Sequence, residues 1–218
     1  MKSLCCALFI MLTLASSVRS QTQGVPDLEK AKKDSTAAAK KMADSVRFAR
    51  LEAISVFPLL KGSKFSGVLP VDNPTEIPDP KRDYKLLFDI AERNPDSTSK
   101  NINTGLDEVA RVLNLHVASG ISPKRLFPVV LVYGKALEAI FTNEKYRQKH
   151  SIDNPNLKLI KDLQDVGAKF IACGQAMAFR DVKKEEILPS VKITLSAQTV
   201  FSNYESQGYI RYKIRENE

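Results

Sequence analysis

The chain has 218 residues, of which 43% are hydrophobic and 27% are charged, so we expect one globular domain with additional segments. Its formal net charge is +8, and removing residues 1–20, which hold Lys2 and Arg19 and no acidic residue, leaves 8 − 2 = +6. Residues 24–68 contain nine Lys/Arg and five Asp/Glu, so most of the basic excess precedes the domain, which argues against nucleic-acid binding.

Residues 1–20 have the layout of a secretory signal peptide. Lys2 supplies a positive charge, Leu4 to Ala15 form an apolar run, and small residues precede a predicted cleavage site before Gln21. The apolar run is shorter than the ~20 residues that span a bilayer, so we expect no membrane span in the mature protein. We therefore predict an exported protein, which would be periplasmic in a Gram-negative source.

Export changes the meaning of the cysteine count. After cleavage before Gln21, Cys173 is the only cysteine left, so an intrachain disulfide is impossible. A single cysteine in an exported chain indicates a reactive thiol or an intermolecular bond. The alternative is that Cys173 serves as a small buried hydrophobic residue.

Residues 21–82 are expected to form a charged helix followed by an arm. From Asp27 to about Phe57, apolar residues recur every three, four or seven positions, which predicts a helix that ends before Pro58. It would serve for docking or oligomerisation, or remain a solvated extension. The segment 59–82 is rich in Gly and Pro and predicts an extended arm. We expect the arm to dock on the domain through three apolar side chains: Phe65, Val68 and Leu69.

The domain is expected to span residues 83–218 and to alternate strands with helices, which predicts an α/β sheet with right-handed crossovers. The predicted strands are Tyr84–Ile90, Leu126–Tyr133, a central strand ending at Cys173, Val191–Leu195 and Tyr209–Ile214. The predicted helices are Thr104–Ser119, Ala136–Phe141, Asn156–Val166, one opening at Gly174, Lys183–Leu188 and Ala197–Ser206, with a polar connection over 143–155. Thr104 is expected to begin a capping box, and Asp107 to pair with Arg111 at i, i+4.

Gly134-Lys135 follows a strand, as a phosphate-binding loop would, but the P-loop pattern fails because position 129 is Val and position 136 is Ala. The helix start at Gly134 and Lys135 is either an anion site or simple turn chemistry. The two histidines, His116 and His150, stand far apart without clustered carboxylates, so we expect no metal. No dinucleotide-binding glycine pattern is present, and we expect no cofactor.

Cys173 is the candidate with a mechanism. It stands where a buried strand ends and a helix begins, and ligands bind at the carboxyl ends of parallel strands. Backbone N–H groups at the helix start, at Gly174 and Gln175, would favour a thiolate, and Arg180 would add positive charge. Gly174 would let the backbone pass close to whatever meets the sulfur.

Segment 167–180, Gly-Ala-Lys-Phe-Ile-Ala-Cys-Gly-Gln-Ala-Met-Ala-Phe-Arg, resembles the cysteine strand of DsrE/DsrF-like proteins. Residues 187–191 and 207–209 resemble that family's C-terminal pattern, and Val132-Tyr133-Gly134 the end of its second strand. The resemblance covers about 83–215. It implies a three-layer α/β/α fold with a five-stranded, mostly parallel sheet, assembly into trimers or hexamers, and a persulfide on the cysteine in sulfur-relay members. Tyr133 stands where members often have His.

Two functions follow from these patterns. The first is an exported sulfur carrier or thiol-redox protein that uses Cys173 with a sulfur donor or acceptor. The second is a non-enzymatic oligomeric binding module in which Cys173 packs at a subunit interface. Whether the protein is an enzyme stays open at this point, because the first function needs an accessible thiol and the second a buried one.

Overall fold

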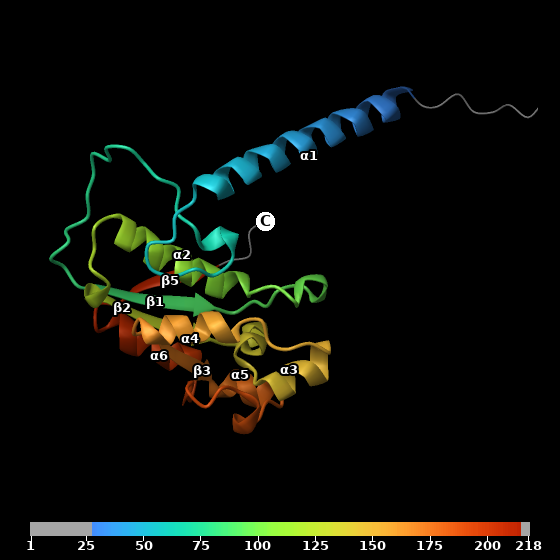
Figure 1. The fold of residues 1–218 in the computed structure, drawn as a ribbon. Coiled ribbons are helices and arrows are strands. Elements are labelled where there is room, and N and C mark those ends of the chain that lie inside the picture. Colours follow the sequence, from blue (N-terminus) through green and yellow to red (C-terminus); the bar gives the residue numbers. More distant parts are fainter. Residues whose placement is uncertain (1–27, 215–218) are drawn as a thin grey trace, which may run out of the picture. The chain divides into compact units, whose positions relative to one another are not determined.

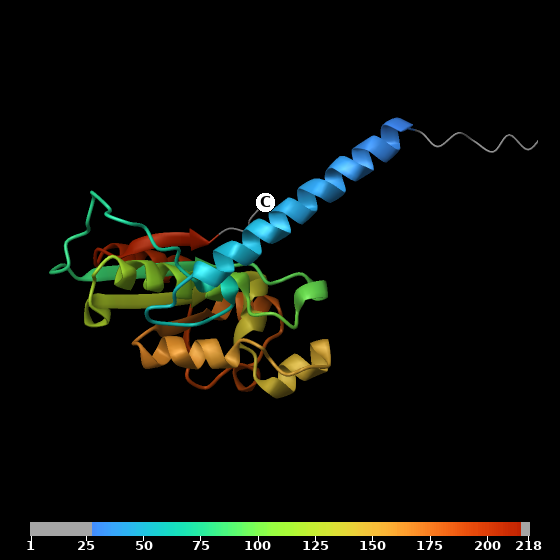
Figure 2. The same cartoon turned by 45° about the horizontal axis from the view of Figure 1, so that its top comes forward.

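The computed structural model describes residues 28–214, and its core is a five-stranded parallel sheet (Figure 1). The strand order is β4-β3-β2-β1-β5, with β5 beside β1 in both Figure 1 and Figure 2. The strands are β1 (Tyr84–Ile90), β2 (Leu126–Val132), β3 (Lys169–Cys173), β4 (Lys192–Thr194) and β5 (Ile210–Ile214). The α/β prediction is confirmed. The strand that ends at Cys173 is not central, however, because the long apolar strand β2 occupies the middle.

The two faces of the sheet are covered by different helices. On one face, α2 (Thr104–Ala118) and α4 (Leu157–Asp165) pack on Leu86, Phe88 and alternate residues of the neighbouring strands. On the other face, α6 (Ala197–Glu205) covers Leu87 and its neighbours. Because successive strand residues point to opposite faces, this arrangement buries the strands on both sides and gives three layers.

The connections differ in detail from the predicted helices. The predicted helix 136–141 is a 3-10 segment, and the predicted helix 183–188 is reduced to a 3-10 turn of three residues. The polar connection contains a helix that was not predicted. Thr142 caps this helix, because its side chain accepts a hydrogen bond from the Lys145 N–H. That helix is polar and short, so it has too few apolar residues to show a period. The remaining elements are α1 (Leu28–Ile54), η1 (Lys64–Ser66), η2 (Asp96–Thr98), η3 (Pro123–Arg125), η4 (Gly134–Ile140), α3 (Asn143–His150), α5 (Gly174–Phe179) and η5 (Lys184–Glu186).

The start of α2 corrects two predictions. Asn103, not Thr104, caps the helix, and its side chain accepts from the N–H groups of the next turn. Asp107 does not pair with Arg111, because it is buried against the arm and Arg111 pairs with Glu108 at 2.6 Å. The N–H and the hydroxyl of Ser63 donate to the Asp107 carboxylate, and these hydrogen bonds, with the helix dipole, offset the cost of burying it.

The arm docks on α2 through its first half. Leu60 and Val68 are buried, whereas Phe65 and Leu69 are exposed, so the prediction that Phe65 and Leu69 dock on the domain was wrong. Leu60 belongs to the domain core, and Val68 pairs with Val56. Asn114, fully buried in α2, accepts from the N–H groups of Leu59 and Leu60 at 3.0 and 2.9 Å. The same side chain donates to two carbonyl groups of the arm, Leu60 O and Ser66 O.

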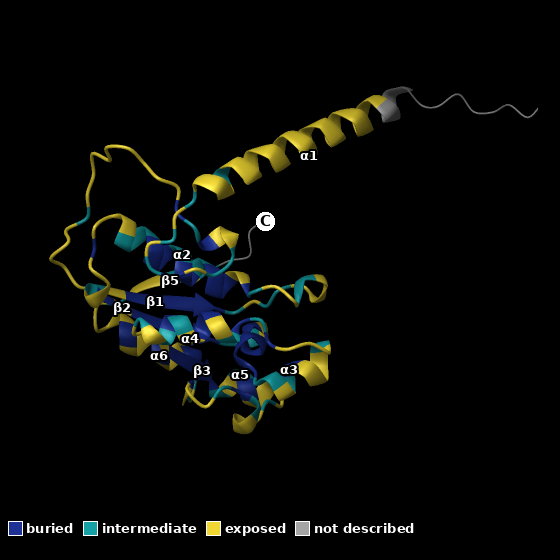
Figure 3. Ribbon diagram, in the orientation of Figure 1, coloured by how far each residue is buried: buried dark blue, intermediate teal, exposed yellow. Residues whose placement is uncertain are grey.

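Helix α1 ends at Ile54, before the predicted end near Phe57, because Val56 pairs with Val68 in an antiparallel bridge. Its side chains from 32 to 50 are all exposed (Figure 3). The chain divides into two compact units, up to Val46 and from Arg47, and the description below concerns the second. No helix among residues 28–214 is both long and apolar enough for a membrane span. The predicted signal peptide lies outside the described residues.

Candidate functional site

The sulfur of Cys173 lies where two helices begin. Cys173 ends β3, caps α5, and is 4% exposed. Its Sγ accepts from the N–H of Ala176 at 3.4 Å and from the N–H of Ala197 at 3.2 Å. Ala176 belongs to the first turn of α5, and Ala197 is the first residue of α6. Two N–H groups and two helix dipoles therefore point their positive ends at one sulfur, which stabilises negative charge on it.

Gly174 is required by the close approach of the next strand. A Cβ at this position would lie 2.7 Å from the carbonyl oxygen of Thr194, at the end of β4. The following residue, Gln175, is exposed, and its N–H donates to Leu195 O at 3.0 Å. Gly174 and Gln175 thus hold the start of α5 against residues 194–195. Ala197 follows two residues later, so the same contact places its N–H next to the sulfur.

Polar side chains from β1 and β5 reach the same face of the sheet. Asp89, in β1, is 1% exposed and accepts from Arg211 of β5, with Nε at 2.9 Å and Nη2 at 2.5 Å. The Arg211 guanidinium lies 3.4 Å above the ring of Phe201, which packs with Cys173 in the core under α6. A buried carboxylate is tolerated here because Arg211 compensates its charge and donates two hydrogen bonds to one of its oxygens, Oδ2.

Tyr133, directly after β2, packs against the same core cluster as Cys173. Burial raises the pKa of its hydroxyl, the Asp89 carboxylate raises it as well, and the net result is a pKa of about 12. Its ring packs edge-on to Phe201, with the ring centres 6.3 Å apart. The tyrosine therefore stays protonated at neutral pH and serves as a hydrogen-bond donor, not as a base.

Asp89 and Arg211 were not predicted as site residues. The usable signal was an acidic residue inside the otherwise apolar strand Leu86–Ile90, because a buried carboxylate needs a partner. The sequence does not show which basic residue pairs with it, since β5 lies 122 positions further along the chain.

The other predicted site residues lie apart from the sulfur's hydrogen bonds. Gly134 adopts a φ of +56°, and a Cβ there would lie 2.9 Å from the carbonyl oxygen of Ala91, so turn geometry accounts for this glycine. Lys135 is exposed. Arg180 extends toward Glu138, with Nη2 at 3.5 Å from Oε1.

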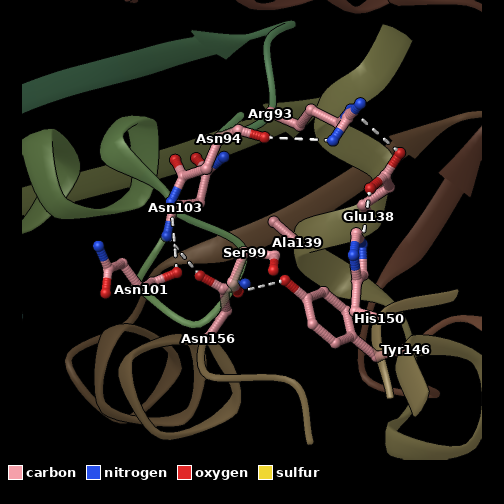
Figure 4. A pocket seen from close by; sticks show the side chains of 10 residues that line it. All are labelled: Arg93, Asn94, Ser99, Asn101, Asn103, Glu138, Ala139, Tyr146, His150 and Asn156. Carbon is pink, nitrogen blue, oxygen red and sulfur yellow. Dashed lines mark hydrogen bonds and ion pairs between the residues drawn. The ribbon is translucent and has the colours of Figure 1, made fainter. Parts of the chain in front are cut away.

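Glu138 is the centre of a second polar cluster. It is 4% exposed and lies in η4, where it contacts Lys149, His150 and Arg93 in addition to Arg180. A small pocket beside it, partly open to solvent and with water-accessible space of about 10 Å³, is shown in Figure 4. Within residues 28–214, no three His, Cys, Asp or Glu side chains are grouped as a metal site would require.

Together, the fold and this site define a parallel α/β protein with one thiol at the carboxyl end of an inner strand, fixed by the N-termini of two helices. A model of the DsrE/DsrF-like family matches residues 85–210, and the chain belongs to this family. Among solved structures, the chain is similar to a protein of unknown function from Methanobacterium thermoautotrophicum, with 16% identity, a TM-score of 0.45, and coverage of 61% of this chain and 100% of that one. No curated protein matches the chain.

Proposed function

We propose that the protein is an exported sulfur carrier in which Cys173 holds a sulfane sulfur as a persulfide. Membership of a family associated with sulfur relay supports this function. The observation that carries it is the pair of N–H donors, from Ala176 and Ala197, directed at one buried sulfur. The thiolate is the form of cysteine that attacks a sulfur donor, and N–H groups directed at Sγ favour negative charge on that sulfur.

The proposed transfer conserves atoms and electrons. The Cys173 thiolate attacks the outer sulfur of a donor persulfide, R–S–SH, and a new sulfur–sulfur bond forms while the donor's own bond breaks. The donor leaves as a thiol, R–SH, after taking a proton, and Cys173 becomes Cys–S–SH. Delivery to an acceptor thiol is the same exchange in reverse. Tyr133 packs against the same cluster as Cys173, and its raised pKa keeps its hydroxyl protonated on this face.

The second candidate is a non-enzymatic oligomeric binding module with a structural cysteine. The burial of Cys173 favours it, because a thiol that is 4% exposed offers little surface to a donor. The two candidates differ in one measurable property, the reactivity of the native thiol relative to the same thiol in the unfolded chain.

Peptide mapping after treatment with inorganic polysulfide tests the choice. Trypsin should release Phe170–Arg180, which contains Cys173 and no other cysteine. The proposal expects this peptide to gain one sulfur, about 32 Da, faster in native protein than in urea-unfolded protein at the same pH. Cys173→Ser is the control for reagent adducts. A native thiol that loads more slowly than the unfolded one would support the binding module instead.

We also propose that the protein forms homo-oligomers, trimers or hexamers. Large apolar side chains are exposed beside the Cys173 segment: Phe179 of α5 is 93% exposed, and Leu195, after β4, is 72% exposed. The two segments that carry these side chains are joined by the Gln175–Leu195 hydrogen bond. Exposed apolar groups of this size favour association.

Export is proposed from residues 1–20 alone. N-terminal sequencing of the protein from culture should begin at Gln21, whereas a mature protein that retains Cys5 would contradict cleavage at this position.

A further inference from the structure

Two helices contact the sulfur of Cys173, and they are held to the domain to different degrees. The sulfur accepts from the N–H of Ala176 in α5 and from the N–H of Ala197 in α6. Helix α6 buries four side chains in or beside the core cluster of the cysteine: Ala197, Val200, Phe201 and Tyr204. Among the described residues 174–179 of α5, Met177 alone is buried. Because packing supplies most of the stability of a short helix, α5 is the easier of the two to displace.

The C-terminal end of α5 is closed by the chain itself. The N–H of Val182 donates to Met177 O at 2.9 Å, and the N–H of Asp181 donates to Ala178 O at 3.2 Å. These two bonds form a Schellman motif, in which the residue after the helix end takes a left-handed conformation that favours glycine. Here that residue is Asp181, with a φ of +51°. The Cβ of Asp181 makes this conformation less favourable, so the closure of α5 is weaker than glycine would make it.

One side-chain contact ties this end of α5 to the rest of the domain. Arg180, the C-cap residue, places Nη2 3.5 Å from Oε1 of Glu138 in η4. Glu138 is also bound by Lys149, Arg93 and His150. The Arg180 side chain can therefore leave without stranding a buried, unpaired carboxylate, which is the costly event when an ion pair breaks.

From this geometry we propose that segment 174–182 is a movable cover of Cys173, which opens while β3 and α6 stay in place and so exposes Sγ. The Arg180–Glu138 contact and the turn at Asp181 set how often the cover opens. The N–H of Ala197 stays on the sulfur during opening, so negative charge on the exposed sulfur remains favoured. As a control of sulfur transfer, the cover rests on the function proposed above. Its opening does not, because any thiol reagent reports it.

Labelling of the native full chain with N-ethylmaleimide tests the cover, followed by mass spectrometry on the tryptic peptide that contains Cys173. At one protein concentration, Arg180→Gln should label about threefold faster than wild type, because the tether is lost. The reagent is neutral, and loss of a positive charge disfavours the reactive thiolate, so faster labelling reports opening and not electrostatics. Asp181→Gly should label about twofold more slowly, because glycine fits the left-handed conformation.

Three variants are matched controls and should label as wild type does. Lys149→Gln removes a partner of the same Glu138 carboxylate, but from α3. Ser151→Gly replaces another left-handed residue, with a φ of +59°, at the C-cap of α3. Ser196→Ala removes the side-chain cap of α6, which accepts from the Gln198 N–H at 3.0 Å.

Two results would overturn the cover. An Arg180→Gln rate equal to that of wild type would reject it, and faster labelling in Ser196→Ala would then identify α6 as the element that opens. A labelling rate that rises with urea as steeply as global unfolding does would mean that the thiol is reached only when the whole domain unfolds. Local opening exposes little surface, so a shallow dependence on low urea is expected. If Arg180→Gln does not fold cooperatively, Asp181→Gly decides the question, because an unchanged rate in that variant would reject the cover.

Discussion

The backbone N–H of Ala197 donates to Sγ of Cys173 at 3.2 Å, which fastens the first turn of α6 to the end of β3. The sulfur therefore has a structural role beside any chemical one. Cys173→Ala would leave this N–H and that of Ala176 without an acceptor, and we expect a loss of about 1–3 kcal/mol in the free energy of unfolding. Cys173→Ser keeps an acceptor and should lose less. Urea denaturation measures both, and an alanine variant as stable as wild type would refute this anchoring role.

Gly174→Ala should be destabilising because its Cβ would meet backbone, not a flexible side chain. The Thr194 carbonyl oxygen would lie at 2.7 Å, so β4 or α5 must move. We expect a cost of about 1–3 kcal/mol. The neighbouring Gln175→Ala is the matched control, since its side chain is exposed and should change stability by less than about 0.5 kcal/mol. Equal thermal unfolding of the two variants would contradict the crowded geometry.

Tyr133 should make stability fall at alkaline pH. Its pKa is raised to about 12 in the folded protein, above the ordinary value of 10.0, because burial and Asp89 disfavour the phenolate. The folded chain thus holds the proton more tightly, so this stabilisation is complete below pH 10 and is lost between pH 10 and 12. The free energy of unfolding of wild type should therefore fall across that window relative to that of Tyr133→Phe, which has no hydroxyl to titrate at this position. A parallel pair of curves would mean that Tyr133 titrates normally.

Asn114→Ala should detach the arm from α2. The side chain accepts from two arm N–H groups and donates to two arm carbonyl groups, and it is fully buried. We expect a loss of about 2–4 kcal/mol, because several buried groups lose their partner at once. Limited proteolysis should then cut within 59–68. Asn114→Asp keeps the acceptor oxygen, so its free energy of unfolding should lie between those of wild type and Asn114→Ala. An arm that is equally protected from proteolysis in all three chains would contradict the docking.

Association is expected to depend on the apolar side chains near Cys173. The double variant Phe179→Ser/Leu195→Ser should shift light scattering from an oligomer to a monomer, because it removes two large exposed apolar groups. Phe65→Ser is the control, since Phe65 is also 67% exposed but belongs to the arm. A monomeric wild type at micromolar concentration would reject the assembly, and an oligomeric double variant would reject this surface.

Local patterns in the sequence determined the class of fold. The apolar run Phe127–Val132 and the strand Tyr84–Ile90 identified buried parallel strands, and the break at Gly174 marked the turn after the cysteine. These features depend on residues close together in the chain, and their period shows directly which structure they form. The short polar helix α3 escaped prediction because its sequence contains almost no apolar period.

Only the tertiary structure decided which side chains meet. Cys173 and Ala197 are 24 positions apart, and Asp89 and Arg211 are 122 apart, so their contacts depend on strand order and not on local preference. The same holds for Glu138, whose cationic partners come from three segments. The sequence by itself determined a cysteine at a strand end. The sheet decided its surroundings, because parallel strands bring their carboxyl ends to one edge whatever their separation along the chain.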